Sequence, residues 1–153
     1  MKKHIRFILI SAALFAIADQ LVKSWALSRL SAGPLSIIDP WFSLQLSFNP
    51  GIAFGIRPPF VLLIIFTLIF IPTLLYLAIK ELNLEKQITR LAISLILGGA
   101  IGNLIDRFTY GAVTDFIKIG PWPNFNLADI YISLGVLFML LFYGKITRSK
   151  KQK

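Results

Sequence analysis

The chain has 153 residues, of which 56% are apolar and only 15% charged. Soluble domains carry about 25% charged residues, and a chain this short cannot bury so much apolar surface in a water-soluble core. The net charge of +9 lies in clusters beside apolar runs, which indicates membrane topology and argues against a nucleic-acid partner.

The first predicted element is a membrane span over about residues 5–27, preceded by Lys2, Lys3 and Arg6. A basic start followed by an apolar run is also typical of a cleaved signal peptide, which would leave three spans. The apolar pattern continues past Asp19 to residue 27, which favours a retained helix.

The first outer segment, about residues 28–59, is too long for a bare turn. Polar and apolar residues alternate from Phe42 to Phe48, which predicts a short strand. Two interpretations remain open: an amphipathic loop that covers helix ends, or a small β-like platform that holds an extended peptide.

Three further spans are predicted, with a second outer segment over about residues 108–126. Pro72 lies inside the second span and is expected to kink it. The fold class is an all-α membrane protein, a single domain over residues 1–153 built as a four-transmembrane-helix bundle with the β-like platform between its first two spans. Basic clusters near both termini and around residues 80–90 place both termini in the cytoplasm. The later spans are residues 60–79, 88–105 and 127–143.

Four of the seven acidic residues lie within or beside apolar spans. Charge at membrane depth is costly, by about 2.5–3.5 kcal/mol at a helix centre, so these residues are functional candidates, or else members of structural ion pairs. Asp19 is four residues before Lys23, which places both on one helix face. The other three are Asp106, Asp115 and Asp129.

The polar residues around these acids converge at the outer ends of the helices. Asn103 precedes Asp106 by three residues, and Asn126 precedes Asp129 by three. Asp129 falls early in its predicted helix, where the helix dipole favours a negative charge. All of these side chains are expected at one depth, near the outer membrane interface.

Two aspartates in one site cannot both ionise easily, so the pKa of one rises. The charged partner can take a proton from water while the protonated one donates to a carbonyl oxygen, which is acid–base hydrolysis of an amide. The chain has no cysteine, and His4 is its only histidine, so thiol nucleophiles, histidine metal sites and a Ser-His-Asp triad are excluded. From these residues alone, a cation site or a proton-coupled transporter stays possible.

The polar motifs resemble those of bacterial lipoprotein signal peptidase, also called signal peptidase II. Each stretch is weak alone, but five in the family's order and approximate spacing are specific. The stretches are Asp19-Gln20-Leu21-Val22-Lys23, Asn49-Pro50-Gly51-Ile52-Ala53-Phe54-Gly55, residues 98–107 (GGAIGNLIDR), Val113-Thr114-Asp115-Phe116 and Phe125-Asn126-Leu127-Ala128-Asp129.

The resemblance implies an aspartic endopeptidase that removes the signal peptide from diacylglyceryl-modified prolipoproteins, cutting just before the lipidated cysteine. It implies catalytic roles for Asp115 and Asp129, which are expected to hold one water between them. Gly51 and Gly55 are expected to let a loop approach the substrate, and Asp106 is expected to pair with Arg107. Supporting residues implied by the resemblance are Asn49, Asn103, Asp106, Arg107 and Asn126, with Asp19 and Lys23 in a less defined role.

The expected setting is the bacterial cytoplasmic (inner) membrane, with the site near its outer face. The expected partners are lipid-modified precursors and membrane lipids, and the protein is expected to act as a monomer without metal or cofactor. The alternatives are a small carboxylate-lined transporter, which would spread polar residues through the membrane depth, and a scaffold, which needs no polar cluster.

Overall fold

The structure is a computed structural model that describes residues 1–51 and 59–147. Gly55, one of the two loop glycines expected near the substrate, therefore lies outside the described residues. The elements in chain order are α1 (Lys2–Arg29), β1 (Leu35–Ile38), β2 (Phe42–Asn49), α2 (Phe60–Glu81), α3 (Gln87–Tyr110), β3 (Val113–Ile119), α4 (Leu127–Leu141) and α5 (Tyr143–Ile146).

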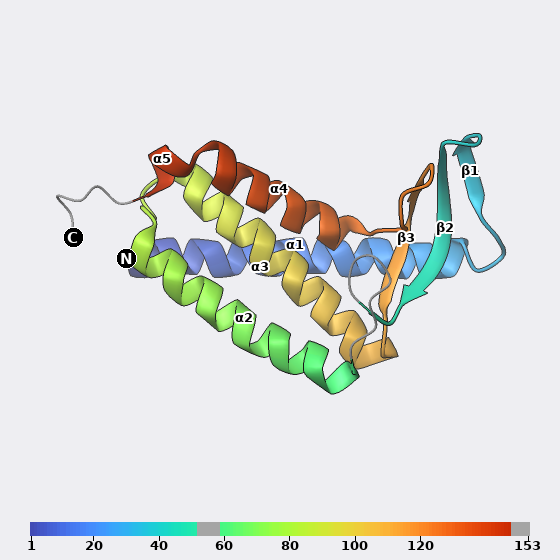
Figure 1. The fold of residues 1–153 in the computed structure, drawn as a ribbon, viewed down its shortest axis with the longest axis horizontal. Helices are drawn as coiled ribbons and strands as arrows, with labels where there is room; N and C mark the ends of the chain where they lie inside the picture. Colours follow the sequence, from blue (N-terminus) through green and yellow to red (C-terminus); the bar gives the residue numbers. More distant parts are fainter. Residues whose placement is uncertain (52–58, 148–153) are drawn as a thin grey trace.

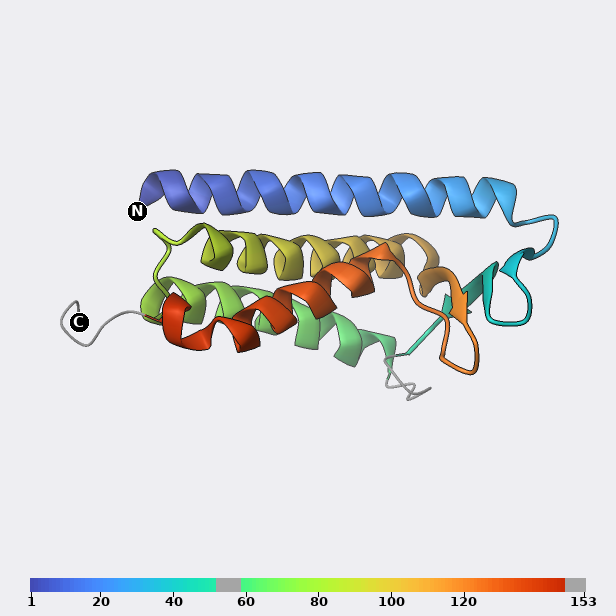
Figure 2. The same cartoon turned by 90° about the horizontal axis from the view of Figure 1, so that it is seen from above.

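The long helices form a bundle with a small sheet at one end (Figure 1). α1 runs along one side, and α2, α3 and α4 lie together on the other (Figure 2). Helix α3 packs extensively against α1 and α4, whereas α2 makes fewer contacts with it. The N-terminus and α5 lie at the end opposite the sheet. The placement of both termini in the cytoplasm stays a prediction.

Three helices, Lys2–Arg29, Val61–Glu81 and Gln87–Tyr110, are long and apolar enough to cross a membrane. Helix α4 is apolar but has only 15 residues, which gives about 22 Å against a hydrocarbon core of about 30 Å. The predicted start of each span agrees with its helix to within a few residues, but α3 extends past Ile105 to Tyr110. The count of four spans stays a prediction.

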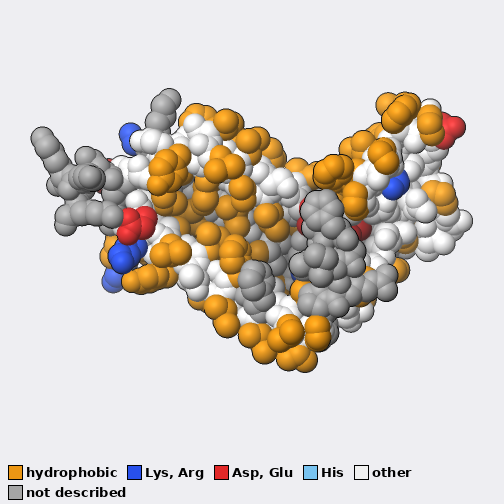
Figure 3. All heavy atoms as spheres, viewed as in Figure 1, with side chains coloured by type: hydrophobic (Ala, Val, Ile, Leu, Met, Phe, Trp, Pro, Cys, Tyr) orange, Lys and Arg blue, Asp and Glu red, His pale blue; other side chains and the backbone are white. Residues whose placement is uncertain are grey.

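Large apolar side chains occupy much of the face of the bundle seen in Figure 3, as a lipid-facing surface requires. Leu14 of α1, Leu68 of α2 and Leu140 of α4 are all more than half exposed. In the same view, Lys and Arg side chains gather mainly at the end that carries the N-terminus. The apolar band and the basic end agree with the pattern read from the sequence.

Glycines bring α3 into close contact with its neighbours, as small residues do between membrane helices. A methyl group on Gly99 would meet the backbone carbonyl of Ala128 at the start of α4. A methyl group on Gly102 would meet the carboxylate of Asp19 on α1. The GGxxG spacing therefore draws the first turn of α4 and the acidic residue of α1 against one stretch of α3.

The sheet is antiparallel, in the order β1-β2-β3. Strand β2 confirms the strand expected in the first outer segment, but β3 comes from the second outer segment, between α3 and α4. The platform is therefore not confined to the link between the first two spans. Strand β3 was missed because Val113 to Phe116 are all buried, so this run shows no polar–apolar alternation.

The sheet rests on the end of α1 through a small apolar cluster of Ala26, Leu30 and Phe116. Asn49 pairs with Val113 and Ser47 with Asp115 across the β2–β3 ladder. This register places the end of β2 beside the first half of β3, near the C-terminal end of α3 and the N-terminal end of α4.

Candidate active site

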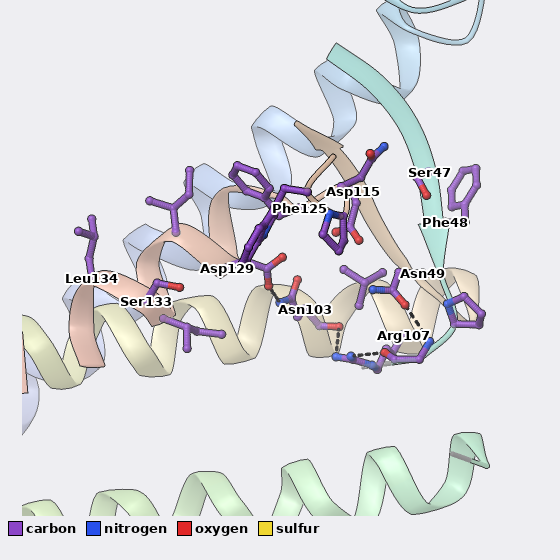
Figure 4. Close-up of a pocket in the computed structure, with 18 residues that line it drawn as sticks. Ser47, Phe48, Asn49, Asn103, Arg107, Asp115, Phe125, Asp129, Ser133 and Leu134 are labelled. Carbon is purple, nitrogen blue, oxygen red and sulfur yellow. Dashed lines mark hydrogen bonds between the residues drawn. The ribbon is translucent and has the colours of Figure 1, made fainter. Parts of the chain in front are cut away.

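A cavity of about 820 Å³ opens between the sheet, the C-terminal end of α3 and the start of α4. Its walls are polar under the sheet and apolar along α4 (Figure 4). The residues that matter for its chemistry are Asn49, Gly51, Asn103, Arg107, Asp115, Trp122, Phe125, Asp129, Ile130 and Leu134.

Asp115 of β3 and Asp129 of α4 point into this cavity from facing elements (Figure 4). The Asp115 residue is only 2% exposed, and its Oδ1 accepts a hydrogen bond of 2.7 Å from Asn126 Nδ2. Asp129 is partly exposed, and its Oδ1 accepts 2.9 Å from Asn103 Nδ2. Asp115 and Asp129 are 14 residues apart in the sequence, yet their carboxyl groups lie in the same cavity.

Asp129 also takes part in capping α4. Asn126 is the N-cap residue, and its side chain accepts a hydrogen bond of 3.0 Å from the Asp129 backbone N–H. In return, Asp129 Oδ2 accepts from the Asn126 backbone N–H at 3.3 Å. This capping box satisfies two free N–H groups of the first turn and fixes the direction of the Asp129 carboxylate.

The two asparagines connect the two aspartates. Asn126 Nδ2 donates both to Asp115 and, at 3.1 Å, to Asn103 Oδ1, while Asn103 donates to Asp129. Asn126 is fully buried. The amide pair therefore links the two carboxyl groups through a continuous chain of hydrogen bonds.

Burial and, next, the negative charge of Asp129 raise the pKa of Asp115 to about 7. Hydrogen bonds from Asn126 and Asn49 and the positive charge of Lys23 act in the opposite direction. Asp115 therefore holds a proton under mildly acidic conditions in which an ordinary carboxyl is ionised. The described residues contain no group of three or more histidine, cysteine or acidic side chains placed to hold a metal ion.

Behind the cavity lies a buried ion cluster, formed by Asp19, Lys23 and Asp106. Lys23 Nζ is 2.8 Å from Asp19 Oδ2 and 3.0 Å from Asp106 Oδ2. The expected Asp19–Lys23 pair is confirmed. The expected pair of Asp106 with Arg107 is wrong, because neighbouring residues point in different directions around a helix and Asp106 faces α1 instead.

Arg107 faces the cavity on the other side of α3. Its guanidinium donates to the backbone carbonyls of Asn103 at 3.3 Å and Gly51 at 3.2 Å. Asn49 Oδ1 accepts from the Gly51 N–H at 3.0 Å. Arg107 thus tethers the start of the loop after β2 to α3, and it lines the cavity with a positive charge.

Sequence reasoning missed Gln20 as a member of this network. Its amide donates to Asp106 Oδ1 at 2.8 Å and to the Gly102 carbonyl at 3.1 Å. A polar residue three positions before Lys23, on the same helix face, was the available signal. All other predicted site residues that the structure describes lie in the cavity, in the ion cluster or in the hydrogen bonds between them.

Comparisons with known proteins agree with this geometry. A family model described as signal peptidase (SPase) II matches residues 11–144. Proteins called lipoprotein signal peptidase are similar: that of Moorella thermoacetica is 35% identical (87% of this chain, 89% of the relative), and that of Clostridium tetani is 39% identical (84% and 86%). A solved bacterial membrane enzyme matches with a TM-score of 0.81 at 29% identity, covering 90% of this chain and 87% of its own. A second such structure matches with a TM-score of 0.73 at 28% identity, covering 88% and 90%.

Proposed function

The chain belongs to the signal peptidase II family and is a multi-pass membrane peptidase of lipoprotein precursors; we propose that it cleaves them by an aspartic mechanism, with Asp115 and Asp129 as the catalytic pair. The observation that carries this proposal is the pair of carboxyl groups that converge on one cavity and are bridged by two buried amides.

In the proposed reaction, a water molecule lies between the two carboxyl groups. Asp129, ionised and stabilised by the helix N-terminus, takes a proton from this water as its oxygen attacks the scissile carbonyl. Protonated Asp115 donates a hydrogen bond to the carbonyl oxygen as negative charge develops there. The proton on Asp129 then passes to the leaving amine as the C–N bond breaks, and Asp115 remains protonated.

The shape of the cavity suits a precursor that carries lipid. Ile130 and Leu134 of α4, and Trp122 and Phe125 of the segment before it, give the cavity an apolar part. We place the diacylglyceryl chains along this apolar part and the scissile peptide under the sheet, beside Asn49. The cut falls just before the lipidated cysteine, whose acyl chains hold it at the depth of the dyad.

The proposed orientation places the sheet at the outer face of the bacterial cytoplasmic membrane and both termini in the cytoplasm. The basic end of the bundle supports it (Figure 3), because positive charge is retained on the cytoplasmic side. The short α4, continued by α5, serves as the fourth span. A transporter fits less well, because α2 is almost wholly apolar and the polar side chains gather at one end.

The rate of cleavage should depend on pH through Asp115. Its pKa is raised to about 7, so the proton that the mechanism needs is present below this pH and is lost above it. We expect kcat/KM to fall about tenfold for each pH unit well above pH 7. The measurement is the initial rate on a lipid-modified precursor in detergent from pH 5 to 9, and a rate that rises through pH 8 would contradict the assignment of Asp115 as the acid.

The function itself is tested with purified protein and two forms of one precursor, with and without the diacylglyceryl group. We expect cleavage of the lipidated form at least about 100-fold faster, since the acyl chains position the scissile bond. A chelator should leave this rate unchanged. Equal rates for the two forms would contradict recognition of the lipid group. Loss of activity on chelation would contradict a mechanism that uses no metal.

A further inference from the structure

The buried ion cluster of Asp19, Lys23 and Asp106 is attached to both catalytic segments. Asp19 Oδ1 accepts a hydrogen bond of 2.9 Å from the backbone N–H of Ala128, the residue before Asp129. Asp106 Oδ2 accepts one of 2.8 Å from the N–H of Thr114, the residue before Asp115. One cluster therefore holds the backbone beside each catalytic carboxyl group.

Lys23 reaches further, to the amide that contacts Asp129. Its Nζ donates to Asn103 Oδ1 at 3.0 Å, and Asn103 Nδ2 donates to Asp129 Oδ1 at 2.9 Å. An amide group has nearly the same shape in its two orientations but opposite hydrogen-bonding character at its two ends. A reversed Asn103 would direct its oxygen at the Asp129 carboxylate and its N–H groups at the ammonium.

Two contacts exclude the reversed orientation, and Lys23 supplies the one that carries a full positive charge. An ammonium group can only donate, so the Asn103 atom that faces it must be the oxygen. Asn126 also donates to that oxygen, and its own orientation is fixed by the Asp129 backbone N–H, which donates to Asn126 Oδ1. The Lys23 ammonium and the Asp129 backbone N–H can only donate hydrogen bonds. They therefore determine which end of the Asn103 and Asn126 side-chain amides carries the oxygen.

We propose that Lys23 is a positioning residue for the cleavage reaction, which holds the Asn103 amide so that its N–H faces Asp129. The proposal rests on the function proposed above. Lys23 is only 2% exposed, and its three N–H groups have partners in Asp19, Asp106 and Asn103. It has no donor left for a substrate, so it acts on catalysis indirectly, through the orientation of Asn103 and through its positive charge near Asp115.

The test compares Lys23→Met, which keeps the length of the side chain without its charge, with Gln20→Met, which loses bonds to the same cluster but has no bond to Asn103. We expect Lys23→Met to lower kcat about 100-fold, as small displacements of reacting groups do, with KM within about twofold. Gln20→Met should keep kcat within about threefold at a similar loss of thermal midpoint.

The pH profile gives a readout that a merely structural role would not change. The charged groups around the dyad are Asp19 and Lys23 on α1 and Asp106 and Arg107 on α3. Of these, Lys23 lowers the pKa of Asp115 through its positive charge. Lys23→Met should therefore move the basic limb of the profile to higher pH, and Gln20→Met should leave it in place. The proposal would be overturned if kcat and the basic limb of the pH profile changed equally in Lys23→Met and Gln20→Met. It would also be overturned if Lys23→Met left both kcat and the basic limb unchanged.

A second variant covers failure of Lys23→Met to fold. Asp19→Asn/Lys23→Met removes one charge of each sign and should show the same fall in kcat. Asp129→Asn is measured in parallel: if it cleaves at the wild-type rate, the catalytic pair itself is wrong. If Asp129→Asn is inactive while both Lys23 variants keep wild-type kcat, only the positioning role fails.

Discussion

Replacement of either Asp115 or Asp129 by Asn should lower the rate of precursor cleavage by about 10³-fold or more. Asn has the shape of Asp, but at position 129 it cannot take the proton from water. At position 115 its amide N–H is a far weaker acid than a carboxyl group, so it stabilises the negative charge on the carbonyl oxygen less. Both carboxyl groups face the cavity and are held by amides, so the substitutions leave the walls of the site intact. The measurement is single-turnover cleavage of a lipid-modified precursor by the purified variants.

The fold should tolerate these two substitutions. Asn at position 129 keeps an oxygen that can accept from the Asn126 N–H, so the capping box of α4 is retained in part. Asp39→Asn is the matched control, because that side chain is exposed in the turn between β1 and β2, away from the cavity. Cleavage near the wild-type rate by a well-inserted Asp115 or Asp129 variant would end the dyad mechanism.

Asp106→Ala should destabilise the protein by about 3–5 kcal/mol, the usual cost of removing one partner of a buried ion pair. Asp106 is fully buried and accepts from Lys23, Gln20 and the Thr114 backbone N–H. Its loss leaves these donors without an acceptor at the point where α1, α3 and β3 meet. The measurement is the thermal or denaturant midpoint of the detergent-solubilised variant.

Glu85→Ala is the control, since Glu85 is an exposed acid at the other end of the bundle, and its effect should stay within about 0.5 kcal/mol. Asp106→Leu combined with Lys23→Met and Asp19→Asn removes all three charges of the cluster and should recover part of the stability. An unchanged midpoint for Asp106→Ala would show that the cluster does not support the fold.

Much of the site was readable from the sequence because charge is expensive in a membrane. Asp19, Asp106, Asp115 and Asp129 stood out against apolar surroundings, and the structure places all four in the cavity or the cluster behind it. The Asp19–Lys23 pair followed from helix spacing alone. The family resemblance supplied the roles of the residues, which spacing does not encode.

The partner of Asp106 and the third strand could not be predicted in the same way. Spacing tells which residues share a face of one helix, but the approach of α1 to Asp106 depends on Gly102 and on packing between helices. Strand β3 lacks alternation because both of its faces are covered. Each of these features depends on contacts between segments that are distant in the chain.

The order of the elements along the chain has a consequence for biosynthesis. Asp129 lies on α4, the last long helix to leave the ribosome, while its partner and the ion cluster come from α1, α3 and β3. Under the proposed mechanism, a nascent chain that has inserted every earlier segment still lacks one of its two catalytic carboxyl groups. We therefore expect the protein to become competent only once α4 is in place, so that unfinished chains do not hydrolyse the precursors being exported beside them.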